Sequence, residues 1–197
     1  MKKETLEMAK KAYATESECI REMAEHFDEE AFGKAVKMLT DAPRIGASGC
    51  GHSGIMCRHF AHLMCCIEQP AKFISPAEAV HGGTGFLQKG DVMLLASRGG
   101  KTAELLPIMD ICRKKGVGII TVTENTESPL AKGADVVLKQ HVNRETDRYN
   151  CQGTTSTTAL AVIFHVLQTM IIEETDFKNE KFAVIHPGGA VGERLNK

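Results

Sequence analysis

A glycine-rich turn, GCGHSG at residues 49–54, directly follows a short apolar run and contains the pattern Gly-x-Gly-x-x-Gly. This pattern opens dinucleotide-binding folds, in which an acidic residue at the end of the second strand holds the ribose hydroxyls. Here the acidic residue about 20 positions on, Glu68, lies before the second expected strand, and Glu78 lies beyond it. The context disfavours a dinucleotide and leaves two interpretations: a tight strand-to-helix turn, or a site for another phosphorylated ligand.

A second glycine-rich turn, SRGGKT at residues 97–102, follows the third apolar run. Its GGKT segment resembles part of a P-loop, but that motif requires glycine where Leu95 stands, so nucleotide hydrolysis loses its main support. Hydroxyl and N–H donors at the start of a helix suit a phosphate monoester, because the helix dipole favours an anion there. The turn supplies such groups from Ser97, Thr102, Gly99, Gly100 and the adjacent Arg98.

Hydroxyl side chains recur in the sequence GTTSTT at residues 153–158, where the last long helical pattern begins. Thr154 and Ser156 are candidates for ligand contact at this position. The alternative is that they act as N-caps, a role for which serine and threonine are favoured because their side chains satisfy free N–H groups at a helix start. The sequence leaves both interpretations open.

Five short apolar runs alternate with helical patterns, which is typical of a parallel sheet covered by helices on both faces. The expected strands cover residues 44–47, 71–74, 92–96, 118–122 and 136–138. The expected helices cover residues 2–26, 29–40, 53–67, 102–115, 127–132 and 154–174. We therefore predict an α/β fold: residues 1–40 form N-terminal helices that pack on the domain or an oligomer interface, and residues 41–197 form the domain.

The composition disfavours several classes of partner. With 24 Lys and Arg, 25 Asp and Glu and no basic stretch, the chain is not expected to bind nucleic acid. The N-terminus is charged, and no apolar run is expected to approach the ~18 residues that cross a bilayer. We therefore predict a soluble, cytoplasmic protein with no membrane contact. Seven scattered cysteines indicate reduced thiols. His59 and His62 lack a closed metal-ligand set, so packing is expected there.

Four segments together resemble the sugar isomerase (SIS) domain family, most closely its arabinose 5-phosphate isomerase branch. They are GCGHSG at 49–54, SPAEAVHGGTG at 75–85, SRGGKTAE at 97–104 and HPGGAVGERL at 186–195, supported by GTTSTTA at 153–159. The resemblance, over about residues 30–197, implies a flavodoxin-like three-layer αβα sandwich around a five-stranded parallel sheet. It implies a phosphosugar at the carboxyl ends of the strands, where open α/β sheets bind ligands.

The resemblance also implies an oligomeric state and a domain organisation. It implies a homo-oligomer, a dimer or a tetramer, in which neighbouring subunits complete the sites. Members of the branch often carry two small regulatory domains after the SIS domain, which are not among these 197 residues.

The same resemblance assigns roles to residues in the matching motifs. It implies that Ser97 and Thr102 bind the phosphate group of the sugar, and it places the serine of the first glycine-rich turn at Ser53. The catalytic candidates that it implies are His81, Glu104, Glu145 and His186. Two positions depart from the branch: His52 stands where a lysine is usual, and Gly99 replaces a serine. The first departure exchanges a fixed cation for a titratable imidazole.

Interconverting an aldose and a ketose phosphate moves a proton between C1 and C2 through a cis-enediol. The reaction needs a base, an acid and donors for the developing oxyanion, as triosephosphate isomerase illustrates with a carboxylate and a histidine. We expect His186 and a glutamate to transfer the proton and His81 to aid ring opening, with no metal or cofactor. Each residue also has a structural alternative; a histidine before Pro-Gly-Gly is often a turn residue.

Two further functions remain open from the sequence. One is a phosphosugar-binding module without catalysis. The other is a different SIS enzyme, such as a hexulose-phosphate isomerase or an amino-sugar-phosphate lyase.

Overall fold

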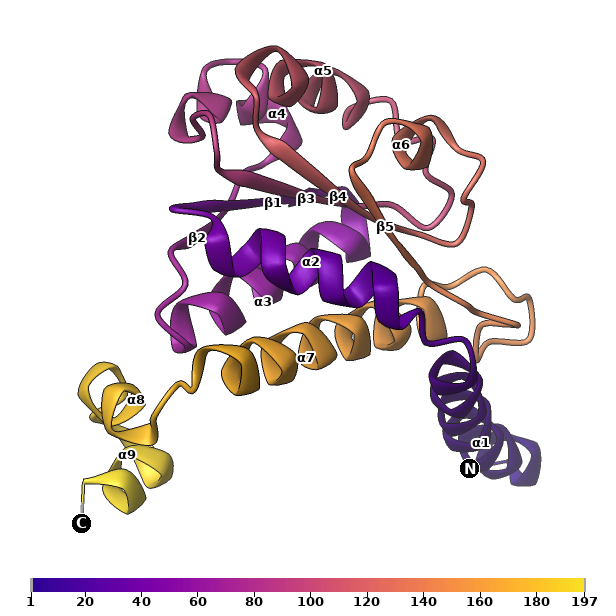
Figure 1. Cartoon of the computed structure of the whole chain (residues 1–197). Helices are drawn as coiled ribbons and strands as arrows, with labels where there is room; N and C mark the ends of the chain where they lie inside the picture. The colour runs from indigo at the N-terminus through magenta and orange to yellow at the C-terminus, as the bar shows by residue number, and fades with distance from the viewer. Residues whose placement is uncertain (1, 197) are drawn as a thin grey trace.

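The computed structural model describes residues 2–196 and contains a five-stranded sheet in which all strands are parallel (Figure 1). The strand order is β2-β1-β3-β4-β5, the flavodoxin-like order. The strands are β1 (Ile45–Gly49), β2 (Ala71–Phe73), β3 (Val92–Ala96), β4 (Gly118–Thr123) and β5 (Val136–Lys139). Each lies within about two residues of its predicted range, so the prediction of a five-stranded parallel sheet is confirmed.

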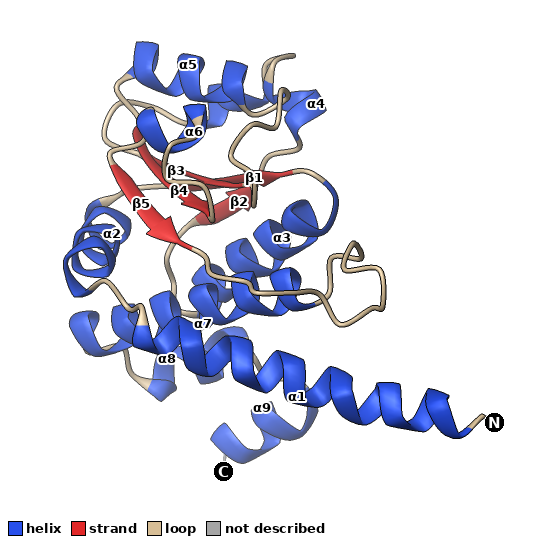
Figure 2. Cartoon of the chain, turned by 90° about the vertical axis from the view of Figure 1, so that its right-hand side faces the viewer, coloured by secondary structure: helices blue, strands red, loops and turns tan. Residues whose placement is uncertain are grey.

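Helices cover both faces of the sheet, which confirms the predicted three-layer sandwich (Figures 1 and 2). The helices are α1 (Lys3–Glu25), α2 (Glu29–Asp41), α3 (Gly51–Cys66), α4 (Pro76–Ala79), α5 (Leu106–Lys115), α6 (Pro129–Lys132), α7 (Thr155–Thr175), α8 (Asn179–Ile185) and α9 (Gly189–Leu195). One buried cluster joins the sheet to α2, α3 and α7, and a second joins it to α5 and α6.

The centre of the sheet is apolar because it is covered on both faces. Every residue of β1 and β3 is buried, as expected for central parallel strands. Below them, Phe60 of α3 and Phe164 of α7 are fully buried, with ring centroids 4.8 Å apart. Helices α3 and α7 pack against each other through this core, and α3 begins directly after β1 at the carboxyl edge of the sheet.

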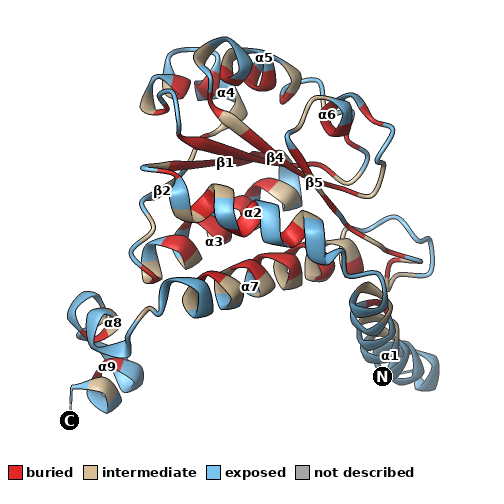
Figure 3. Cartoon of the chain, in the orientation of Figure 1, coloured by how far each residue is buried: buried red, intermediate tan, exposed pale blue. Residues whose placement is uncertain are grey.

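The two N-terminal helices differ in how they contact the domain. Helix α2 contributes the fully buried Ala35 and Leu39 to the main core. Helix α1 has one buried residue, Cys19, and its N-terminal half extends away from the domain (Figures 2 and 3). Of these two helices, only α1 therefore stands largely outside the α/β body.

Several element boundaries differ from the prediction. Helix α5 begins at Leu106 instead of 102, because residues 101–105 form a turn in which the Leu105 N–H donates to the Thr102 carbonyl at 3.1 Å. The short helices α4, α8 and α9 and a 3-10 turn at Gly83–Phe86 were not predicted. Each is too short for helical periodicity to reveal it in sequence.

Helix α7 is long and apolar enough to cross a membrane when judged by length and composition alone, with a mean hydropathy of 1.5. The expectation of no such apolar run is therefore wrong for this helix. In the fold, α7 packs against α1, α2 and α3, and its buried Leu160, Phe164 and Leu167 belong to the main core. Neighbours on several sides explain its apolar composition.

Candidate active site

The strand order places a ligand site between β1 and β3. From β1 the chain first moves outward to β2 and then crosses back to β3, on the other side of β1. The direction of strand order therefore reverses between β1 and β3. Ligands of open α/β sheets bind at such a point, beyond the carboxyl ends of the strands. The turns after β1 and β3 are the two glycine-rich segments, residues 49–54 and 97–102.

The turn after β1 requires glycine because β1 and α3 approach closely. A Cβ on Gly54 would lie 2.5 Å from the Gly49 carbonyl oxygen, and Gly51 has a φ of +54°. The pattern therefore serves strand–helix packing. Ser53 is half-buried and His52 is exposed, both in the first turn of α3. Both side chains stand at the expected edge of the sheet.

The turn after β3 is held together by its own hydroxyls. The buried Ser97 Oγ lies 2.8 Å from Thr102 Oγ1 and accepts a hydrogen bond from the Gly100 N–H at 3.1 Å. Gly100 has a φ of +64°, and a Cβ there would lie 2.0 Å from Ser128 Oγ. Gly99 is exposed with open space around it. Because α5 begins later than predicted, the hydroxyls precede the helix start, and its dipole acts on them from farther away.

An open pocket of about 410 Å³ lies beside the turn after β1. It is lined by the first turn and the start of α3, by the segment after β2 and by Glu104. Glu104 is exposed and lies in the turn before α5, so it does not cap that helix. Sequence reasoning missed Arg58, which lines the same pocket with its guanidinium 4.1 Å above the Phe73 ring. Its position one helical turn after Gly54 is the signal that could have indicated it.

Glu145 is buried and surrounded by donors. One carboxylate oxygen accepts from Arg98 at 2.6 Å. The other accepts from the Thr154 and Ser156 N–H groups at 2.9 and 3.1 Å and from the Thr154 hydroxyl at 3.2 Å. Burial opposes ionisation, but hydrogen bonds from Ser156 and the charge of Arg98 outweigh it and lower the pKa of Glu145. This carboxylate connects the loop after β5 to β3 and α7.

The same contacts answer the question about the threonine run. Thr154 is the N-cap residue of α7 but makes no side-chain capping hydrogen bond. The Glu145 carboxylate occupies this helix start instead, where the helix dipole favours a negative charge. Arg98 is likewise engaged, since it also pairs with Glu124 at 2.7 Å. In this structure Arg98, Thr154 and Ser156 all serve the protein's own hydrogen-bond network.

His52 contacts this loop through its ring. A Cβ on Gly153 would lie 3.1 Å from His52 Nδ1, so the imidazole rests against the backbone just before α7. The residue that departs from the family pattern therefore bridges the first glycine turn and the loop after β5.

The two remaining histidines are placed differently. His81 is exposed in the turn after α4, which follows β2 at the same edge of the sheet. His186 lies between α8 and α9, beyond the far end of α7, a 21-residue helix about 30 Å long (Figure 1). Its ring lies 5.0 Å from that of Phe182, and its Nδ1 is buried without a hydrogen-bond partner. One chain therefore does not bring His186 to the glutamates.

Within residues 2–196, no group of three or more metal-binding side chains is arranged to hold an ion. His59 of α3 and His165 of α7 face each other with their Nε2 atoms 3.1 Å apart. His62 lies 3.7 Å from the Cys66 sulfur. These contacts join neighbouring helices and turns.

Comparison with known proteins identifies the fold and its relatives. The SIS domain matches residues 38–171. Arabinose 5-phosphate isomerase KdsD of Pseudomonas aeruginosa is 38% identical over 165 residues, which cover 83% of this chain and 51% of that protein. The chain thus spans about half the length of this curated relative.

Two solved structures are also similar over most of the chain. A protein of Listeria monocytogenes, proposed to be a sugar-phosphate isomerase, is 37% identical with a TM-score of 0.92, covering 95% of this chain and all of that one. An Escherichia coli CFT073 protein in complex with a phosphosugar is 27% identical with a TM-score of 0.89, with the same coverage. The matched segment, the relatives and the sheet order agree: this chain belongs to the SIS domain family.

Proposed function

We propose that this chain is a sugar-phosphate isomerase, with arabinose 5-phosphate and ribulose 5-phosphate as the pair to test first. The observation that carries the proposal is the open pocket at the carboxyl edge of the sheet, which is lined by the turn after β1 and by Glu104, two residues after the Ser97–Thr102 turn. The similarity to arabinose 5-phosphate isomerases supports the substrate class. The free cysteines fit a reducing compartment such as the cytoplasm.

In the proposed reaction, Glu104 removes the proton from C2 of the open-chain aldose while an acid protonates O1, which forms the cis-enediol. The O2 hydroxyl then loses its proton and C1 gains one, giving the ketose. Glu104 suits the role of base because it is exposed and lines the pocket. Glu145 suits it poorly, because its lowered pKa and its four hydrogen bonds favour the bound carboxylate.

His186 enters this scheme only from a neighbouring subunit. It lies between α8 and α9, beyond the far end of α7 from Glu104 in one chain, so only a second chain would bring it to that carboxylate. We assign it as the acid of a shared site, with His81 as an aid to ring opening. Mixing inactive Glu104→Gln and His186→Ala chains as a dimer should then restore about one quarter of wild-type activity, because one site in four is intact. Mixtures that stay inactive would count against a shared site.

The main test is proton exchange at C2 of sugar phosphates in D₂O, followed by NMR. Wild type should exchange the C2 proton and accumulate the ketose, and Glu104→Gln should slow both by at least 10²-fold, as for a general base. Glu127→Gln, an exposed carboxyl paired with Lys132, is the matched control and should leave the rate unchanged. Exchange that survives in Glu104→Gln would refute the assignment of the base.

A second candidate is phosphosugar binding without turnover. The observation that favours it is the engagement of Glu145 and Arg98 with each other, which leaves Glu104 as the free carboxylate of this pocket among residues 2–196. Saturable binding of a sugar phosphate with no C2 exchange for any member of the panel would support this alternative over the isomerase.

A further inference from the structure

Two histidines from distant segments face each other where α3 and α7 pack together. The Nε2 atoms of His59 and His165 lie 3.1 Å apart, although the residues are 106 positions apart in the sequence. Their ring centroids are 5.4 Å apart, so the two Nε2 atoms point toward each other. His59 is half-buried and His165 is exposed. Ions in the solvent can therefore reach the pair.

The packing of the two helices holds the pair in place. Phe60 and Phe164, each next in sequence to one of the histidines, are fully buried with ring centroids 4.8 Å apart. Gln168 of α7 also donates a hydrogen bond to the Leu63 carbonyl of α3 at 2.9 Å. These contacts fix the distance between the helix backbones. A ligand shared by the two histidines therefore needs only side-chain rotations, as in sites built on rigid elements.

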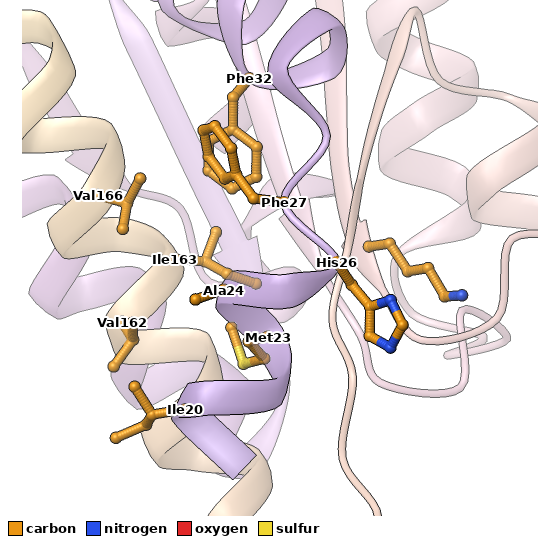
Figure 4. Close-up of a pocket in the computed structure, with 10 residues that line it drawn as sticks. Ile20, Met23, Ala24, His26, Phe27, Phe32, Val162, Ile163 and Val166 are labelled. Carbon is orange, nitrogen blue, oxygen red and sulfur yellow. The ribbon is translucent and has the colours of Figure 1, made fainter. Parts of the chain in front are cut away.

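Helix α7 is also held on a second face. Val162 and Val166 line an apolar groove of about 290 Å³ between α1, α2 and α7 (Figure 4). His165 directly precedes Val166 and so points about 100° away from it around the helix. The histidine pair therefore uses a face of α7 that the groove leaves free.

The distance between the Nε2 atoms fits two ligands of one metal ion. Imidazole nitrogens bind Zn²⁺ at about 2.0–2.1 Å, so two of them at an angle of about 90–110° lie about 2.9–3.4 Å apart. The observed 3.1 Å falls in this range. Without an ion, one ring donates a hydrogen bond to the other. To bind an ion together, both rings must tilt, and the donating ring must move its proton to Nδ1, with no net release of protons.

The protonation of the pair also suits a metal. Burial and the nearby imidazoles of His165 and His62 lower the pKa of His59. A neutral imidazole offers the lone pair that a metal needs, so protons compete less for His59 near neutral pH. Zn²⁺, Ni²⁺ and Cu²⁺ accept imidazole, whereas Mg²⁺ and Ca²⁺ prefer oxygen ligands. The donor set therefore selects a transition metal.

We propose that His59 and His165 bind one divalent transition-metal ion, of the Zn²⁺, Ni²⁺ or Cu²⁺ class, between α3 and α7. Among residues 2–196 no third His, Cys, Asp or Glu is placed to join them, so water completes the coordination. The ion links two helices of the main core and stabilises the folded chain by mass action. The pair does not line the pocket of Glu104, so the inference goes beyond the proposed function.

The first test is isothermal titration calorimetry of the full chain, free of any histidine tag, with Ni²⁺. Wild type should show a saturable site for one ion per chain. His59→Gln and His165→Gln should each weaken this site at least ~10-fold, because each removes one of the two protein ligands. The matched control is His62→Gln, which removes an exposed histidine three residues along α3 and should change the dissociation constant less than ~3-fold.

The second test identifies the nitrogens and the effect on the fold. Zn²⁺ is diamagnetic, so ¹⁵N NMR of the imidazoles should show the Nε2 signals of His59 and His165 shifting together as the ion is added. Ni²⁺ should raise Tm in wild type and His62→Gln but not in the variant that carries both His59→Gln and His165→Gln. Circular dichroism verifies that each variant keeps its helices.

Three results would overturn the proposal: no saturable Ni²⁺ binding by wild type up to about 1 mM, unchanged binding in both His59→Gln and His165→Gln, or an equal loss in His62→Gln. Proton exchange at C2 of sugar phosphates is measured without added metal and should be unchanged in His59→Gln. Failure of the metal site is therefore distinguishable from failure of the isomerase proposal.

Discussion

Substituting Glu145 with glutamine tests whether this carboxylate anchors the loop after β5 to the rest of the site. Its side chain is 2% exposed and accepts hydrogen bonds from Arg98, Thr154 and Ser156. Glutamine keeps the size but removes the charge and turns one acceptor into an N–H donor. That donor must then face either the Arg98 guanidinium or the N–H groups at the start of α7.

The contacts set the size of the effect. Removing one partner of a buried ion pair costs about 3–5 kcal/mol, and a backbone N–H left without an acceptor costs about 1–3 kcal/mol. The ion-pair cost should be reduced here, because Arg98 is 39% exposed and keeps Glu124 as a partner. We expect the free energy of unfolding to fall by about 2–4 kcal/mol, which lowers Tm by roughly 5–15 °C in a chain of this size.

The effect should also depend on pH. Burial opposes ionisation of Glu145, but hydrogen bonds from Ser156 and the charge of Arg98 outweigh it, so the pKa is lowered in the folded state. A carboxyl of this kind contributes stability that is present above its unfolded pKa and is lost as the pH falls through its folded pKa. The stability difference between wild type and Glu145→Gln should therefore be constant near neutral pH and shrink below the ordinary value of 4.5.

Urea unfolding of wild type, Glu145→Gln and the control Glu127→Gln at several pH values measures this difference. If Glu145→Gln is as stable as the control throughout, the carboxylate does not anchor α7. Glu145 would then return as a candidate for the catalytic base.

Three further predictions concern the glycine-rich turns. Ser97→Ala combined with Thr102→Ala should weaken phosphosugar binding by about 2–5 kcal/mol; equal thermal shifts by sugar phosphates and free sugars would remove the phosphate assignment. Gly100→Ala should destabilise the fold by about 2–4 kcal/mol, because its φ is +64° and the new Cβ meets a hydroxyl at 2.0 Å, whereas Gly99→Ala enters open space and should be near neutral in the same urea titration. His52→Lys should shift the ratio of kcat/KM values toward arabinose 5-phosphate across a sugar-phosphate panel; an unchanged ratio would make His52 a turn residue.

The sequence by itself determined the sheet. Each strand is a short apolar run between turn residues, because strands covered on both faces must be apolar along their whole length. The alternation with helices then makes the strands parallel, and parallel strands bring the turns after β1 and β3 to one edge. The positions of Ser97, Thr102 and Glu104 near that edge follow from the sequence.

The short elements were not predictable in the same way. Helix α4 spans four residues and α8 and α9 seven each, fewer than periodicity needs. The start of α5 was placed too early because the pattern of residues 102–105 resembles a first helical turn. The turn of residues 101–105 and Pro107 at the start of α5 delay the helix.

The tertiary structure alone decided what the charged residues do. Nothing in the order of residues shows that Glu145, 47 positions from Arg98, pairs with it and caps α7. Nor does it show that His186 lies a whole helix away from Glu104 in one chain. Such contacts depend on how the loop after β5 folds back over β3 and on the length of α7, and the energy of a buried charge is set by donors from distant segments. Local pattern determines elements, whereas these partners arise only when the elements are packed.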